Sequence, residues 1–331
     1  MYGNPGLRFH GRFSPCGSVA RSPRINKYAR RRSRDNPSDA PRPRTLRKKT
    51  LNEKNFTMKA VMNEAELYHK SNSLQRRDAL NCLDEYADRI KWRSEGDRVI
   101  DIGCGDGSVT AEVVRARMGR GRLVGCDLSE QMVKYAAQHH RDARTSFCVL
   151  DIEGDLPDEH RGVYHHAFSF YTLHWIHQQE KAFTNIFDLL APGGDCLLIF
   201  LGHMPMFDVY RVLSTSPKWS RWLADVEKYI SPYHDSLEPE KDIAQMMKRI
   251  GFREVEVQYK DSTFIYDKLE ILRKAVMAVN PFSIPKDLQD SFMDDYLDVV
   301  RDLRLMDEAN NNVDSVSIRT HYSLIVAYGT K

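Results

Sequence analysis

The chain has 331 residues, of which 41% are hydrophobic, so it can hold one large globular domain or two small ones. Its net charge of +3 is the sum of a basic segment and an acidic one. Residues 1–60 hold 16 Lys and Arg and 3 Asp and Glu, whereas the remainder holds 33 Lys and Arg and 43 Asp and Glu. An acidic body argues against a nucleic-acid partner or an anionic membrane surface, and no apolar run approaches the roughly 20 residues that cross a bilayer.

Residues 1–61 are rich in Arg, Pro and Ser and lack apolar periodicity. Such a composition cannot bury enough surface to offset the entropy of ordering, so it predicts a disordered basic extension. A transit peptide or a nucleic-acid-binding arm is the alternative, since the segment is Arg-rich and poor in acids. We favour the extension because the motifs begin only after Met62, and we take 62–331 as the folded domain.

Short apolar runs alternate with helical periodicity in this domain. A helix is predicted over 63–90, and three more over 109–118, 129–140 and 180–190. Strands are predicted at 98–102, 122–126, 145–150, 164–170, 196–201, 254–260 and 321–328. The alternation predicts an α/β fold with a doubly wound, mostly parallel seven-stranded sheet.

The last third of the sequence is mainly helical in pattern. Helices are predicted at 206–213, 219–230, 239–250, 266–279 and 285–306. Because two strands accompany this block, we expect a helical cap over about 203–315 within a single domain.

Cysteine and histidine spacing argues against a metal. The six cysteines form no C-x-x-C pair, and the histidines lack the i, i+4 spacing with an intervening Glu that a helical zinc site needs. We therefore expect no metal site, reduced thiols and a cytoplasmic protein.

A glycine-rich turn follows the first predicted strand and opens a helix. It runs Asp101-Ile102-Gly103-Cys104-Gly105-Asp106-Gly107, and its glycines allow a ligand to approach the backbone at a helix N-terminus. A dinucleotide fingerprint would place its third glycine at 108, where Ser108 stands, so the turn favours S-adenosylmethionine over NAD. Asp101 adds a carboxylate suited to the cofactor's cationic groups.

Two more acids follow the next two predicted strands. Asp127, with Leu128 beside it, is expected to accept hydrogen bonds from ribose hydroxyls, and Asp151, with Ile152, to meet the adenine amino group. Each acid alone could be an ordinary cap. Together they stand at the carboxyl ends of successive strands, where open α/β sheets bind ligands.

Two stretches carry a resemblance to a known family. Residues 71–75, ending in Gln75, and 169–176, including Leu173-His174-Trp175, resemble the insect juvenile hormone acid O-methyltransferases, which are class I S-adenosylmethionine-dependent enzymes with a Rossmann-like fold. Residues 230–235 and 280–282 look like the same group, and the resemblance covers about 62–331. The pattern is related to that of plant carboxyl methyltransferases that esterify salicylate.

The resemblance implies a small-molecule substrate, a sesquiterpenoid acid. Juvenile hormone acid or farnesoic acid would be esterified to juvenile hormone or methyl farnesoate. In the plant relatives a Gln and a Trp bind the substrate carboxylate, and Gln75 and Trp175 match those positions, with His174 as a further candidate. An ionised acid needs no general base, only placement against the methyl group. Without the resemblance, all three residues would be read as structural.

A sesquiterpenoid tail needs an apolar tunnel, and the predicted cap offers large side chains that could equally pack the core. These are Phe207, Tyr210, Trp219, Trp222, Ile230, Tyr233, Phe264 and Phe282.

Several alternatives stay open. The chain could act on another small carboxylic acid such as a fatty acid, or be an RNA or protein methyltransferase that uses the basic tail. The acidic body and the lack of an Asn-Pro-Pro-Tyr type of motif disfavour the latter. A non-enzymatic cofactor sensor or hormone-binding protein is disfavoured by the intact glycine turn. The sequence leaves open whether the chain forms a homodimer.

Overall fold

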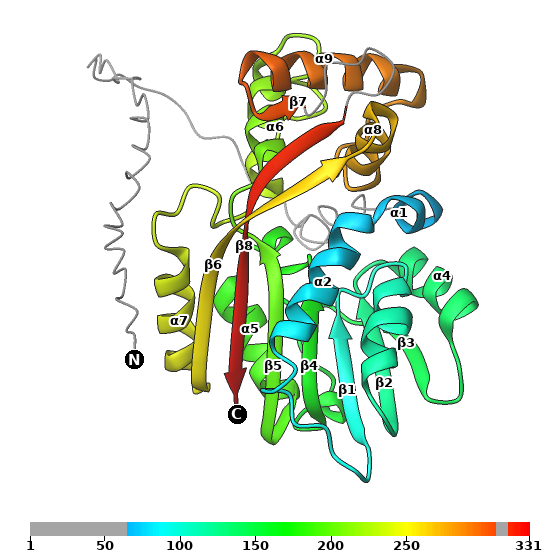
Figure 1. Ribbon diagram of the computed structural model, residues 1–331, viewed down its shortest axis with the longest axis vertical. Coiled ribbons are helices and arrows are strands. Elements are labelled where there is room, and N and C mark those ends of the chain that lie inside the picture. Colours follow the sequence, from blue (N-terminus) through cyan, green and yellow to red (C-terminus); the bar gives the residue numbers. More distant parts are fainter. Residues whose placement is uncertain (1–64, 309–316) are drawn as a thin grey trace, which may run out of the picture. The chain divides into compact units, whose positions relative to one another are not determined.

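The computed structural model describes residues 65–308 and 317–331, so the predicted extension over 1–61 lies outside the described residues. The main sheet has the order β3-β2-β1-β4-β5-β8-β6, and the short β7 pairs with β8 (Figure 1). The first five strands of this order are parallel, and β8 is antiparallel to both β5 and β6. The strands are β1 Asp97–Ile102, β2 Gly121–Asp127, β3 Thr145–Val149, β4 Tyr164–Phe170, β5 Leu190–Leu201, β6 Arg253–Tyr266, β7 Met306–Glu308 and β8 Ile318–Thr330.

The seven predicted strands are confirmed, but the last three are longer than predicted. β5 includes residues 190–194, which the sequence marks as a turn with Pro192 and Gly193. β6 and β8 pair from Arg253↔Thr330 to Tyr266↔Ile318 and continue as a ribbon beyond the parallel strands toward α8 and α9 (Figure 1). β7 was not predicted, because its three residues fall at the end of an apolar pattern that the sequence presents as helix.

The helices that flank the sheet mostly lie where predicted. They are α1 Ala65–Ser71, α2 Ser73–Glu85, α3 Arg115–Arg117, α4 Glu130–His140, α5 Gln179–Leu189, α6 Pro205–Thr215, α7 Pro239–Ile250, α8 Leu269–Ala278 and α9 Gln289–Asp302. Short turns η1 Thr110–Val114, η2 Asp158–His160, η3 Leu173–Trp175, η4 Val226–Tyr229 and η5 Lys286–Leu288 join them.

Two helix predictions are wrong. The helix predicted over 63–90 is divided between α1 and α2 by Asn72, whose buried side chain leaves the helix to donate to Ser108 Oγ at 2.9 Å. The helix predicted over 219–230 is a series of turns ending in η4. Its apolar spacing reflects burial of Trp219, Leu223 and Val226, which such turns also provide.

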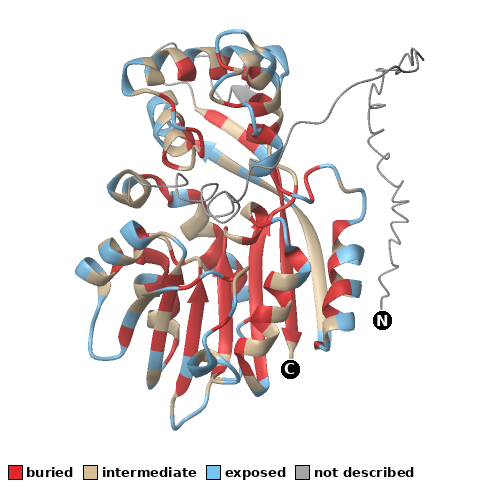
Figure 2. Ribbon diagram, turned by 180° about the vertical axis from the view of Figure 1, so that it is seen from behind, coloured by how far each residue is buried: buried red, intermediate tan, exposed pale blue. Residues whose placement is uncertain are grey.

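The sheet is covered on both faces, and its strands β1, β4, β5 and β8 are among the most deeply buried elements, whereas β6 is mostly of intermediate exposure (Figure 2). One core packs α5 and α7 against the sheet, and the other packs α2, α6 and α9 against the opposite side chains of the same strands. Within 203–315, α7 lies on α5 and β6, whereas α6, α8 and α9 gather at the end of the sheet where the parallel strands finish (Figure 1). None of the helices in the described part of the chain is long and apolar enough to cross a membrane.

Candidate active site

The glycine turn lies at the carboxyl end of β1. Gly103, Gly105 and Gly107 all have positive φ, at 74°, 55° and 80°. A Cβ on Gly103 would lie 2.0 Å from Thr172 Oγ1, and the Thr172 hydroxyl donates to the Gly103 carbonyl at 3.2 Å. The turn therefore packs directly against the segment that follows β4, so the two predicted motifs share one site.

Asp101 lies beneath this turn with 1% of its surface exposed. Its Oδ2 accepts a hydrogen bond from the Thr110 hydroxyl at 2.5 Å, whereas its buried Oδ1 has no partner among the described residues. Burial raises the pKa of Asp101 to about 7; the Thr110 hydrogen bond opposes this rise and the charge of Asp127 adds to it. The free oxygen makes Asp101 a ready acceptor for a cationic ligand group.

Asp127 lies at the end of β2 and points toward the glycine turn. Its Oδ2 accepts the backbone N–H of Gly105 at 3.0 Å, and its Oδ1 accepts that of Ser129 at 2.8 Å. Burial raises the pKa of Asp127, and the backbone N–H groups oppose the rise. The carboxylate therefore also holds the turn in shape.

Of the remaining predicted cofactor residues, Asp151 and Leu128 lie at the surface and Ile152 is buried. Asp151 is exposed, and its Oδ1 accepts the N–H of Glu153 at 2.9 Å, as a turn cap does. Leu128 is 38% exposed and Ile152 is 6% exposed. The three acids thus run from buried to exposed in the strand order β1, β2, β3, along one edge of the sheet.

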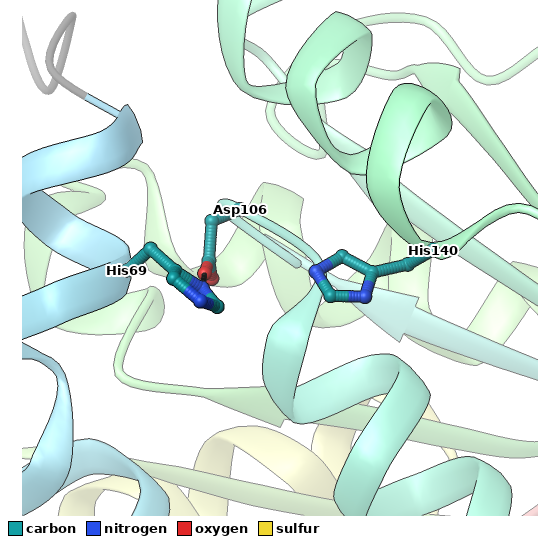
Figure 3. A group of neighbouring side chains, drawn as sticks. All are labelled: His69, Asp106 and His140. Carbon is teal, nitrogen blue, oxygen red and sulfur yellow. Dashed lines mark hydrogen bonds and ion pairs between the residues drawn. The ribbon is translucent and has the colours of Figure 1, made fainter.

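Helix α1 covers the glycine turn. The Tyr68 ring would lie 3.4 Å from a Cβ on Gly105. The next residue, His69, places its Nδ1 2.7 Å from Asp106 Oδ2, with His140 of α4 beside the pair (Figure 3). The side chains of Tyr68 and His69 therefore cover the predicted cofactor site.

Two groups of three side chains could each reach one metal ion in the described part of the chain. They are His69, Asp106 and His140, and His203, Asp208 and His234; the potential ligand atoms within each group lie within 4.8 Å of one another. Sequence spacing could not indicate either group, because at least one member of each comes from a distant segment, as His234 does in the second. In the second group, the centroids of the His203 and His234 rings are 4.6 Å apart and their planes are inclined by 7°. Rings stacked in this way do not direct a nitrogen lone pair from each at one ion. The expectation of no metal stays a prediction.

A larger pocket adjoins the turn on the cap side. It encloses about 620 Å³ of empty space, counting its open mouth, against about 280 Å³ for the cleft at the turn. Tyr68 and Gln75 line both, so they stand between the two spaces. The larger pocket has no Lys, Arg, Asp or Glu among its lining residues, which are Tyr68, Leu74, Gln75, Tyr171, His174, Trp175, Leu201, Met204, Met206, Tyr266, Leu272, Ala275, Val276, Val279, Tyr296 and Thr320.

Three polar atoms of this lining are buried without a partner among the described residues: Gln75 Oε1, Trp175 Nε1 and Thr320 Oγ1. Unpaired buried polar atoms are costly, so a ligand that pairs with them would bind favourably. The two ends of the Gln75 amide are alike in shape, so rotation of the amide can present its NH2 group instead of the oxygen. The structure thus brings Gln75 and Trp175 into one pocket.

His174 lies in the same lining but is neutral. Its Nδ1 accepts the N–H of Leu201 at 3.4 Å, which places the proton of the neutral ring on Nε2. Burial lowers the pKa of His174 to about 3. A histidine with this pKa is a poor general base at neutral pH, so His174 fits a packing or hydrogen-bonding role better than proton transfer.

None of the eight large side chains considered for the tunnel is among the residues that line this pocket. Most are buried in the two cores, and Trp222 and Phe264 pack against them. Besides His174 and Trp175, the aromatic residues of the lining are Tyr68, Tyr171, Tyr266 and Tyr296, which sequence reasoning missed. Only Tyr171 carried a signal, since it lies within the 169–176 motif.

The cleft at the glycine turn offers hydrogen-bond acceptors that suit the polar groups of S-adenosylmethionine. Asp101, whose Oδ1 has no partner among the described residues, and Gly103 both line this cleft; Asp127 is not in the lining but lies beside it at the adjacent strand end, where it accepts the Gly105 N–H. A cationic amino acid head and a ribose both need acceptors of this kind.

Comparison with known proteins gives a family match and close relatives. Residues 99–194 match the family model described as a methyltransferase domain. The chain is 58% identical over 273 residues to juvenile hormone acid O-methyltransferase from Bombyx mori, covering 82% of this chain and 98% of that protein. It is 42% identical over 277 residues to the enzyme of the same name from Drosophila melanogaster, covering 82% and 93%.

Among solved structures, the YcgJ protein from Bacillus subtilis matches with a TM-score of 0.51 and 17% identity, over 77% of this chain and 98% of that one. At that identity the likeness concerns the fold, and it agrees with the parallel sheet described above.

Proposed function

Because this chain belongs to the juvenile hormone acid O-methyltransferase family, we propose that it esterifies the carboxylate of juvenile hormone acid or farnesoic acid. It is an S-adenosylmethionine-dependent O-methyltransferase. When bound, S-adenosylmethionine supplies a methyl group on a cationic sulfur, which leaves as a neutral thioether when the methyl carbon bonds to a carboxylate oxygen.

One observation carries the proposed substrate. The buried Trp175 Nε1 and Gln75 Oε1 have no partner among the described residues, and they lie in a pocket that adjoins the glycine turn and whose lining has no Lys, Arg, Asp or Glu. Two neutral donors can hold an ionised acid without the strong ground-state stabilisation of a cation, so its oxygen stays nucleophilic. The apolar remainder of the lining suits a hydrocarbon tail.

The residues of the chain act in this mechanism by binding and orientation. Gln75 and Trp175 hold the carboxylate, while Tyr68 and Gln75 stand between the two spaces and exclude water from the point of transfer. No group needs to remove a proton, which agrees with a neutral His174. Asp101, the glycine turn and Asp127 hold the cofactor, with Leu128, Asp151 and Ile152 toward the adenine end.

The test is methyl transfer from labelled S-adenosylmethionine to a panel containing juvenile hormone acid, farnesoic acid and straight-chain fatty acids. Gln75→Leu removes the amide at nearly the same side-chain size, and Trp175→Phe removes the indole N–H but keeps a smaller aromatic ring. Hydrogen bonds to charged groups contribute about 1.5–3 kcal/mol, so each variant should lower kcat/KM for the acid about 10- to 100-fold. Trp222→Phe, outside the pocket lining, is the matched control.

Absence of labelled ester from wild-type protein with every acid would refute the proposed function. Faster turnover of a fatty acid than of either terpenoid acid would move the substrate to the alternative class.

We also propose that the enzyme is cytoplasmic and has no nucleic-acid partner, in line with the acidic charge of residues 61–331. We further propose that it can form a homodimer, which size-exclusion chromatography tests.

A further inference from the structure

We propose that Asp78 is a positioning residue, which acts through the Tyr171 hydroxyl to fix the turn that carries Trp175 against the helix that carries Gln75. The inference rests on the proposed function, because the roles of Gln75 and Trp175 are assigned there. Asp78 is not among the residues that line the pocket, so it acts on the reaction through other groups.

The Asp78 carboxylate joins elements that are distant in the sequence. It lies on α2 and is 3% exposed. Its Oδ2 accepts the hydroxyls of Tyr171, after β4, and Tyr322, on β8, each at 2.5 Å. Its Oδ1 accepts Nε and Nη2 of Arg77 at 2.9 and 2.7 Å. A buried carboxylate with both oxygens paired holds its partners in a narrow range of geometry.

Both tyrosines remain protonated, and therefore hydrogen-bond donors, around neutral pH. Burial, with the charge of Asp78 adding to it, raises the pKa of Tyr171 and of Tyr322 well above the usual range. The hydroxyl protons therefore stay in place between the phenol oxygens and the carboxylate.

Tyr171 needs such restraint because its backbone is strained. Its φ is +60°, a conformation that residues other than glycine seldom adopt. Its N–H donates to the Ile199 carbonyl of β5 at 2.7 Å, which fixes the backbone on one side, and the Asp78 bond fixes the side chain on the other. The strained residue directly precedes Thr172, which packs on Gly103.

The spacing along each element connects this bond to the site. Gln75 precedes Asp78 by three residues on α2, so the two lie on the same face of the helix about one turn apart. Trp175 follows Tyr171 by four residues and ends η3. The Asp78–Tyr171 bond therefore sets the distance between the two groups that hold the carboxylate.

Positioning of this kind matters because the pocket holds the acid with neutral groups alone. Without a charge to guide the substrate, the rate depends on alignment of the carboxylate with the methyl group, and an error of about 1 Å can cost about 100-fold. We therefore expect loss of the Asp78–Tyr171 bond to reduce kcat more than it raises KM.

The experiment compares Asp78→Asn, Tyr171→Phe and the double variant by steady-state kinetics. Each single variant should lower kcat about 10-fold or more, with KM for the cofactor within twofold of wild type. If both residues act through one bond, the double variant should be no slower than the slower single variant. Tyr322→Phe removes the other hydroxyl from the same carboxylate oxygen and is the matched control, with kcat expected within about threefold of wild type.

Three kinetic outcomes would overturn the proposal. One is an unchanged kcat in both single variants. A second is a double variant whose loss equals the product of the single losses, because Tyr171 would then act on the substrate by itself. An equal loss in Tyr322→Phe and Tyr171→Phe would show a general structural role and would also overturn it.

Hydrogen exchange tests the positioning role of Asp78 independently of the proposed function, because the measurement needs no substrate. In Asp78→Asn and Tyr171→Phe, the amides of Trp175 and Ile176, which donate within the η3 turn, should exchange at least tenfold faster than in wild type. Unchanged exchange there would refute the positioning role. If exchange rises while wild-type protein esterifies no acid, the substrate assignment fails and the positioning of the turn stands.

Discussion

The carboxylate of Asp127 accepts a hydrogen bond from the backbone N–H of Gly105 at 3.0 Å, so the acid at the end of β2 also holds the glycine turn. Asp127→Asn keeps the shape but leaves only one oxygen for the two N–H groups of Gly105 and Ser129. The variant should lower the free energy of unfolding by about 1–3 kcal/mol, because a buried donor loses its partner. S-adenosylhomocysteine should bind at least tenfold more weakly in a calorimetric titration.

Asp151→Asn is the control for this prediction. Asp151 is exposed, so its replacement should change the free energy of unfolding by less than about 0.5 kcal/mol. If Asp127→Asn is as stable as Asp151→Asn in unfolding, the glycine turn does not depend on the Asp127 carboxylate.

Local patterns in the sequence were sufficient for the strands and for most of the helices, and they also selected the candidate site residues, whose roles stay a proposal. Strand ends marked by Gly and Asp place Asp101 and Asp127, and the family motifs place Gln75 and Trp175. Contacts between distant segments have no such pattern. Asp78 appears in the sequence as one more charged residue of a helix, and its burial depends on Tyr322, which lies 244 positions away. The pocket lining was missed for the same reason, since β6 and β8 extend into the cap only through pairing with each other.

Binding of the cofactor should release a proton from Asp101. With its pKa raised to about 7, this carboxyl is largely protonated at pH 6, whereas a cationic ligand group beside Oδ1 would lower the pKa. The affinity should therefore increase as pH rises from 6 to 8. Calorimetric titration at pH 6.5 in buffers of different ionisation enthalpy should show release of up to one proton, and Asp101→Asn should abolish this release. A buffer-independent heat in wild type would contradict the expected contact.

The unpaired hydroxyl of Thr320 should contribute nothing to stability, in contrast with that of Thr110. Both residues are fully buried, but of the two hydroxyls only that of Thr110 has a partner in the described part of the chain, Asp101 Oδ2. Thr320→Val should leave the free energy of unfolding unchanged or raise it by up to about 1 kcal/mol, and Thr110→Val should lower it by about 1–3 kcal/mol. Urea unfolding of the two matched variants measures the difference. An equal loss in both would mean that Thr320 also has a partner, such as an ordered water.

Stability should fall in acid because His174 is buried as the neutral ring. Its pKa is lowered from 6.5 to about 3, so between these values the unfolded chain binds a proton that the folded protein does not. The free energy of unfolding therefore decreases as pH falls from about 6.5, by about 1.4 kcal/mol per pH unit for one such group. His174→Gln keeps an acceptor for the Leu201 N–H and cannot titrate, so the difference in slope between wild type and variant, measured by urea unfolding from pH 6 to pH 4, isolates this contribution. Parallel slopes would mean that His174 binds a proton in the folded protein, and a role in proton transfer would then have to be reconsidered.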